Sequence, residues 1–111
     1  MGDNKPFDIV IYGATGFTGQ LVVEYMQAHC AHTDVKWAIA GRDAAKLSAI
    51  ANQFSLPETV SIIVADSHDE TALRSLVTQT KVVLTTVGPY QIYGDTLISL
   101  CAQLGTDYVD L

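Results

Sequence analysis

The chain has 111 residues, enough for one domain, and a formal net charge of −6 at pH 7. This acidic balance argues against nucleic acid or an anionic membrane surface as the main partner. No run approaches the ~20 apolar residues that span a bilayer, and no basic-then-apolar signal opens the sequence. We therefore expect a cytoplasmic protein without a transmembrane segment. Cys30 and Cys101 stand among apolar neighbours and are interpreted as buried thiols of a reducing compartment.

The charged fraction is low for so small a chain. Charged residues make up 16% of the sequence and hydrophobic residues 49%, against about 25% charged residues in an average domain. Because a small domain has much surface for its volume, this shortfall indicates that part of the surface is covered by a partner or by further chain.

The sequence from Phe7 to Gly19 predicts a strand, a tight turn and the start of a helix. Residues 7–12 form a short, β-branched apolar run, typical of a strand buried on both faces. Gly13 would permit the turn, Gly16 would let a pyrophosphate approach, and Gly19 would let the helix pack on its strand. Free N–H groups at the start of the helix favour an anion there.

We therefore predict a dinucleotide cradle in this turn, which the spacing of the three glycines favours over a glycine-rich turn that binds nothing. Its expected contact residues are Gly13, Thr15, Gly16, Phe17, Thr18 and Gly19.

A helix is expected from about Phe17 to Cys30. Its expected inward face consists of Phe17, Leu21, Val22, Tyr25 and Met26. His29 and His32, with Cys30 between them, resemble metal ligands, but no second ligand cluster occurs in the sequence. We interpret them as ordinary surface histidines, and no metal is expected.

Strands and helices alternate along the remaining chain. Further strands are expected at residues 35–40, 60–65, 82–87 and 108–111. Asp43 is the expected N-cap of a second helix, whose inward stripe is Leu47, Ile50, Ala51 and Phe54. Ser67 and Glu70 fit a capping box for a third helix, whose inward residues are Leu73, Leu76 and Val77. A fourth helix, with Leu97, Cys101 and Leu104 facing inward, should end at Gly105.

This alternation predicts an α/β fold of the Rossmann type. We expect a doubly wound parallel sheet of about five strands, in the order 3-2-1-4-5, with helices on both faces. The last strand would form an edge with no helix after it. Residues 1–111 are therefore expected to be an NAD(P)-binding domain from the N-terminal part of a longer protein, with its substrate domain elsewhere. An apolar patch beside the last strand should drive self-association or homo-oligomer formation.

The residues after the second strand favour NADP(H) over NAD(H). An NAD site places Asp or Glu there to bind the adenosine ribose, whereas this chain has Arg42, with Lys46 one turn later. Arg42 can bind a 2′-phosphate through two hydrogen bonds, and Lys46 can add a second charge. Asp43 could instead neutralise Arg42, and the two cations could also be ordinary solvated surface charges.

Other candidates follow the third and fourth strands. Asp66 could accept from the adenine amino group or could be a turn residue. Gly88 and Pro89 would end the fourth strand near the expected nicotinamide half of the site. Thr85 and Thr86 are expected in that strand, where one hydroxyl could touch the cofactor.

Catalytic residues are not evident in the sequence. The Tyr-x-x-x-Lys dyad of short-chain dehydrogenases does not occur, since Gly94 follows Tyr90 and Leu97 follows Tyr93 at the lysine position. Tyr90 and Tyr93 are the weak candidates for proton transfer.

Several segments together resemble saccharopine dehydrogenase-like oxidoreductases, especially the trans-acting enoyl reductase branch. They are residues 7–19, 40–42, 82–90, 93–94 and 105–111. The resemblance implies an N-terminal NADP-binding domain, followed in the family by a larger substrate domain, and enoyl reduction of a lipid-like substrate.

The leading interpretation is the cofactor domain of an NADP-dependent oxidoreductase that transfers hydride to or from a small or lipid-like substrate. The alternative is a non-catalytic NADP(H)-sensing or scaffold protein. The fragment itself is expected to bind NADPH without turnover.

Overall fold

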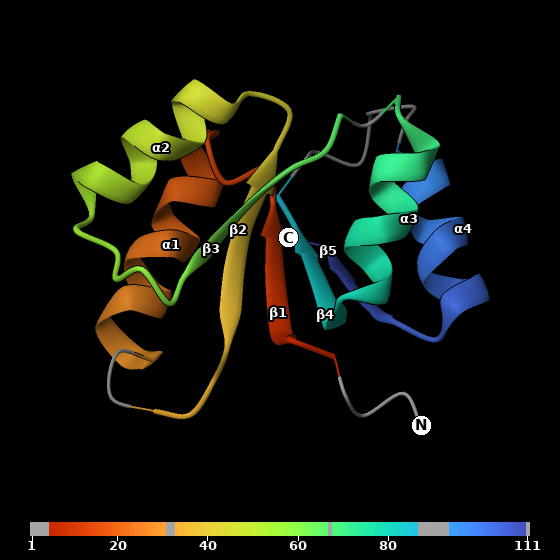
Figure 1. Cartoon of the computed structure of the whole chain (residues 1–111), viewed down its shortest axis with the longest axis horizontal. Coiled ribbons are helices and arrows are strands. Elements are labelled where there is room, and N and C mark those ends of the chain that lie inside the picture. Colours follow the sequence, from red (N-terminus) through yellow and green to blue (C-terminus); the bar gives the residue numbers. More distant parts are fainter. Residues whose placement is uncertain (1–4, 31–32, 67, 87–93, 111) are drawn as a thin grey trace.

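A computed structural model of the chain describes residues 5–30, 33–66, 68–86 and 94–110. Strands and helices alternate, as the sequence predicts (Figure 1). The strands are β1 (Phe7–Tyr12), β2 (Trp37–Gly41), β3 (Ser61–Val64), β4 (Thr80–Thr85) and β5 (Asp107–Asp110). The helices are α1 (Phe17–Cys30), α2 (Ala44–Gln53), α3 (Glu70–Thr78) and α4 (Gly94–Leu104).

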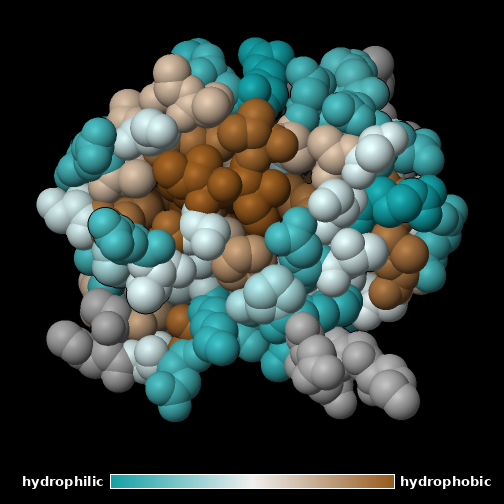
Figure 2. All heavy atoms as spheres, viewed as in Figure 1, coloured by the Kyte–Doolittle hydropathy of each residue, from teal (hydrophilic) through white to brown (hydrophobic). Residues whose placement is uncertain are grey.

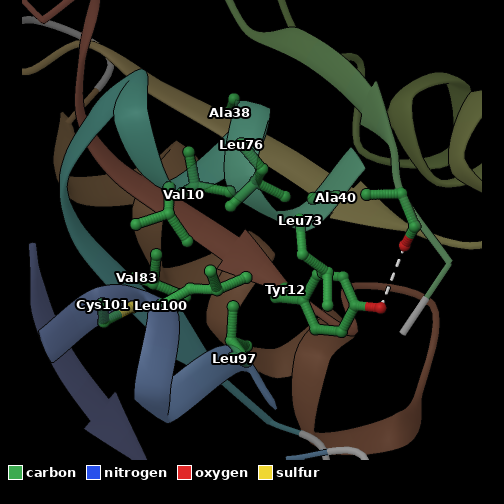
Figure 3. Close-up of a cluster of buried hydrophobic side chains, with 12 residues drawn as sticks. Val10, Tyr12, Ala38, Ala40, Leu73, Leu76, Val83, Leu97, Leu100 and Cys101 are labelled. Atoms are coloured by element: carbon green, nitrogen blue, oxygen red, sulfur yellow. Dashed lines mark hydrogen bonds between the residues drawn. The ribbon is translucent and has the colours of Figure 1, made fainter. Parts of the chain in front are cut away.

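The sheet is entirely parallel, in the order β3-β2-β1-β4-β5, which confirms the predicted Rossmann-type topology. Helices α1 and α2 cover one face, and α3 and α4 cover the other (Figure 1). Alternate residues of β1 therefore point into two cores. Ile11 packs with α1 and α2, whereas Val10 and Tyr12 pack with α3 and α4 (Figure 3).

Tyr12 links three strands at one end of the sheet. Its ring lies in the core beside Ala40 of β2, and its hydroxyl donates to the carbonyl oxygen of Ala65, 2.9 Å away (Figure 3). Because β2 lies between β1 and β3, the small side chain of Ala40 leaves room for the ring to reach past it. The end of β3 is thereby fixed to the strand that leads into the glycine turn.

The boundaries of β2 to β5 differ from the prediction by one or two residues. β2 begins at Trp37 and not at Val35, because the N–H of Lys36 donates to the Asp8 carboxylate, 2.9 Å away. β4 begins and ends two residues early, at Thr80 and Thr85. Thr80 is fully buried and pairs in register with Phe7, so a polar residue starts the strand. The outer strands β3 and β5 differ from the expected ranges by one residue at their described ends.

The expected inward face of α1 is wrong for three of its five residues. Phe17, Leu21 and Tyr25 are 80%, 53% and 60% exposed. Met26 is buried as expected, and Val22 is half-buried. The buried residues of the helix are Gly19, Val23 and Met26. The close approach of Gly19 to the glycine turn sets this orientation, because only a residue without a side chain fits there.

The inward stripes of the other helices are confirmed, as is the Asp43 cap of α2, which accepts from the N–H of Lys46. The N-cap of α3 is not Ser67, which lies outside the described residues. Asp69 takes that role, accepting from the N–H of Ala72, 3.1 Å away. Gly105 follows α4 with a φ of +73°, as expected of a C-terminal cap.

Both cysteines are free thiols, in helices on opposite faces of the sheet. Burial raises the pKa of Cys101 to about 11.

The His29 ring stacks on Tyr25 with ring centroids 4.0 Å apart, and His32 lies outside the described residues. In the part of the chain that the structure describes, no group of three His, Cys, Asp or Glu side chains could hold a metal ion. None of the helices described there is long and apolar enough to cross a bilayer.

Exposed apolar side chains occur on both edge strands. Hydrophobic residues gather over the middle of the face that β3 crosses (Figure 2), where Ile62 and Val64 are 39% and 50% exposed. Val109 of β5 is 42% exposed. Only Val109 belongs to the last strand, beside which the association surface is expected, since β3 forms the opposite edge of the sheet. Self-association stays a prediction.

Candidate dinucleotide-binding site

The site lies where the parallel strands end. Tyr12 pairs with Ala40 and with Thr85, and Gly41 pairs with Val64. Because all these strands run in the same direction, the segments that follow them meet along one edge of the sheet. The glycine turn, Arg42, Asp66 and Thr86 all lie at that edge.

Gly13 makes the turn that leads from β1 to α1. Its φ is +88°, a conformation that residues with a side chain rarely adopt. Its N–H donates to the carbonyl oxygen of Ala40, 2.9 Å away, and its carbonyl oxygen accepts from Gly16 at 3.2 Å. The predicted conformational role of Gly13 is confirmed.

Gly19 is the point of closest approach between the helix and the turn. A Cβ placed on Gly19 would overlap the carbonyl oxygen of Gly13 and lie 2.8 Å from the Cα of Ala14. Both neighbours are backbone atoms, which cannot turn aside as a side chain can. Its predicted packing role is therefore also confirmed.

The start of α1 carries backbone N–H groups that hydrogen bonds within the helix do not reach. Among the described residues, no acceptor is bonded to the N–H of Thr15, Phe17, Thr18 or Gly19. Among the described residues, a Cβ placed on the exposed Gly16 would meet only the Gly13 carbonyl oxygen, 3.6 Å away, so none of them fills the space beyond it. Open space beside free N–H groups and the positive end of a helix dipole fits a diphosphate.

The carbonyl groups of the turn, in contrast, have partners. The Thr86 hydroxyl donates to the Gly13 carbonyl oxygen, 2.9 Å away, and the Gln20 side-chain amide donates to that of Thr15, 3.0 Å away. Thr86 follows β4 and does not belong to it, and Thr85 is buried as the last residue of that strand. No motif in the sequence singles out Gln20. Only its position, four residues after Gly16 and in the first turn of the helix, could have indicated a contact with the glycine turn.

Arg42 is the first residue after β2, and its side chain is exposed. The described residues include no carboxylate that forms an ion pair with it. Asp43 caps α2 through the N–H of Lys46 at 3.1 Å, so this carboxylate is engaged by the backbone. Arg42 and the exposed Lys46 thus flank the N-terminus of α2, where the helix dipole is also positive.

Asp66 is an exposed turn residue. Its carboxylate accepts from the N–H of His68 at 2.8 Å, and its carbonyl oxygen accepts from Asp69 at 2.9 Å. The turn role is therefore observed, and an adenine contact stays a prediction. Gly88, Pro89, Tyr90 and Tyr93 lie outside the described residues.

A family model described as "Saccharopine dehydrogenase NADP binding domain" matches residues 9–111. The chain belongs to this family. The predicted resemblance and the predicted cofactor class are thereby confirmed. The five-stranded sheet and its helices form the NADP-binding domain of this family.

Curated relatives of this NADP-binding domain include mycobacterial proteins. A trans-acting enoyl reductase of Mycobacterium ulcerans is 40% identical over 108 residues, and a putative trans-acting enoyl reductase of Mycobacterium tuberculosis is 42% identical over 108 residues. Each match covers 96% of this chain and 25% of the relative. The chain therefore spans about a quarter of the length of these relatives.

Solved structures with the same fold include oxidoreductases. A short-chain dehydrogenase/reductase from Veillonella parvula, in complex with NADP, superposes with a TM-score of 0.73 at 18% identity, over 94% of this chain and 46% of that protein. An NADPH-dependent quinone oxidoreductase from Escherichia coli gives a TM-score of 0.69 at 25% identity, over 91% of this chain and 33% of that protein. The likeness to the Veillonella protein is evidence for the fold alone.

Proposed function

We propose that this domain binds NADP(H) with the diphosphate at the start of α1 and the adenosine 2′-phosphate at Arg42 and Lys46. It would serve a longer oxidoreductase that transfers hydride to or from a small or lipid-like substrate. The observation that carries the proposal concerns the described residues: backbone donors without an acceptor among them lie at the same edge of the sheet as an arginine without a carboxylate partner among them.

Electrostatics at the start of α2 supports the position of the 2′-phosphate. The first turn of this helix holds no acidic residue. Arg42 and Lys46 instead place positive charge beside the positive end of the helix dipole, and the Asp43 carboxylate at the N-cap offsets part of this repulsion. A bound phosphate would relieve this repulsion and gain charge-assisted hydrogen bonds. An NAD(H) ribose, which carries no phosphate at this position, would do neither.

When bound, the nicotinamide would supply or accept the hydride, and the protein would orient it. Enoyl reduction is the reaction we propose, because the curated relatives are named for it. The substrate pocket would be completed by chain beyond the domain, and Tyr90 and Tyr93 stay candidates for proton transfer. A cytoplasmic location is part of the proposal, since two free thiols on opposite sheet faces suit a reducing compartment.

Titration of the chain with NADPH and NADH side by side, followed by nicotinamide fluorescence, tests the binding proposal. NADPH should bind at least about tenfold more tightly, because hydrogen bonds to charged groups contribute about 1.5–3 kcal/mol. Failure of both dinucleotides to saturate the protein would overturn it.

NADPH oxidation by the longer protein, measured against a panel of enoyl and imine substrates, tests the enzymatic part. Turnover of an enoyl substrate would support the reductase. Tight NADPH binding with no turnover on any substrate would instead favour an NADP(H)-sensing or scaffold protein.

A further inference from the structure

The glycine turn is held by two side chains that contact it from outside. Three of the four carbonyl oxygens in residues 13–16 accept hydrogen bonds from described residues. That of Gly13 accepts from Thr86 and Gly16, that of Thr15 accepts from Gln20, and that of Gly16 accepts from the N–H of Gln20 at 2.9 Å.

These contacts fix two peptide groups at both ends. The Thr15–Gly16 peptide has its carbonyl bonded to the Gln20 side chain and its N–H bonded to the Gly13 carbonyl. The Gly13–Ala14 peptide has its carbonyl bonded to Thr86 and its N–H directed at the Ala40 carbonyl, 3.3 Å away. A peptide held at both ends cannot rotate without breaking both bonds.

This restraint matters because glycine peptides rotate easily. A rotated peptide would turn a carbonyl oxygen toward the space where the free N–H groups point, and its negative partial charge would repel a phosphate. With both peptides fixed, neither can turn its carbonyl oxygen toward an arriving anion, so these two peptides need no reorganisation when it binds.

We infer that Gln20 and Thr86 are positioning residues for dinucleotide binding, which orient the glycine turn by occupying its carbonyl oxygens. The inference rests on the proposed binding of the diphosphate at this turn. Neither residue needs to touch the cofactor. The sequence allows one hydroxyl of Thr85 or Thr86 to touch the cofactor; in this inference Thr86 acts through Gly13 instead.

The test compares two ligands on Gln20→Ala, Thr86→Val and the unchanged chain. The ligand 2′-phospho-ADP-ribose carries the diphosphate, whereas 2′-AMP carries only the 2′-phosphate. Each variant should bind 2′-phospho-ADP-ribose about fivefold more weakly, the equivalent of one ordinary hydrogen bond of ~1 kcal/mol. Both should bind 2′-AMP as the unchanged chain does. Thr86→Ser, which keeps the hydroxyl, should restore binding.

Gln27→Ala is the matched control, since Gln27 lies on the same helix and its side-chain amide faces the Ser55 carbonyl, away from the turn. It should bind both ligands normally. Unchanged binding of 2′-phospho-ADP-ribose by Gln20→Ala would overturn the inference, as would an equal loss for both ligands. If Thr86→Val fails to fold, the part-exposed Gln20 still decides the matter. Failure of the unchanged chain to bind 2′-phospho-ADP-ribose would refute the proposed function instead.

Discussion

Substitution of Gly19 by alanine tests whether the close contact between α1 and the glycine turn determines the stability of the domain. The added Cβ would overlap the Gly13 carbonyl oxygen and lie 2.8 Å and 2.9 Å from two backbone atoms of Ala14. Overpacking of this kind costs typically 1–3 kcal/mol, and fixed backbone neighbours place this case near 3 kcal/mol. Alanine regains up to about 1 kcal/mol from its higher helix propensity. The clash therefore wins, with a net loss of about 2 kcal/mol.

This loss should lower Tm by roughly 10 °C for a domain of this size. Urea unfolding, followed by the fluorescence of the single tryptophan, Trp37, measures it directly because that side chain is buried in the α1 and α2 core. Gly16→Ala is the matched control. Its Cβ would have no neighbour closer than 3.6 Å among the described residues, so stability should change by less than about 0.5 kcal/mol. Equal stability of Gly19→Ala and Gly16→Ala would refute the packing argument.

Further outcomes follow from Asp8 and from the two thiols. Hydrogen bonding from the Lys36 N–H, and then from the Lys81 ammonium 3.2 Å away, lowers the pKa of Asp8. Because the pKa of Asp8 is lower in the folded than in the unfolded protein, its ionised carboxylate stabilises the fold at pH values above the unfolded pKa near 4. This stabilisation is lost as the pH falls through the folded pKa. The free energy of unfolding of Asp8→Asn should therefore fall less below pH 4 than that of the unchanged chain. An equal fall in both proteins, measured by acid unfolding, would contradict this. A thiol reagent at pH 8 should modify the half-buried Cys30 quickly and Cys101 only on unfolding, because burial raises the pKa of Cys101 to about 11. Equal labelling rates in the folded protein would count against that burial.

Much of the fold can be predicted from the sequence because strand and helix patterns alternate without interruption. The order of the strands follows from that alternation and from the handedness of the crossovers. The orientation of α1 is harder to predict, since apolar residues occur all around this helix and periodicity alone does not select a face. Gly19 supplies the missing information, because a glycine needed for close packing must face the sheet, and Val23 and Met26 lie on its side.

The candidate site also has features that the sequence predicts and features that only the structure reveals. The conformational roles of Gly13 and Gly19 could be predicted because steric exclusion acts locally. The partners of the turn's carbonyl oxygens could not, since Thr86 lies 73 residues from Gly13 and meets it only in the folded sheet. The role of Asp43 also needed the structure, because the sequence allows its carboxylate to bond either to Arg42 or to the backbone of α2.

The measurement that tests the account most directly is the affinity of Arg42→Ala for NADPH and for NADH. Arg74→Ala, which removes an exposed arginine paired with Glu70 on α3, is the matched control. The account predicts that Arg42→Ala weakens NADPH binding by about tenfold or more, the loss of one charged contact. It also predicts NADH binding within twofold of the unchanged chain and no effect of Arg74→Ala. Equal losses for the two dinucleotides, or no loss of NADPH binding, would contradict it.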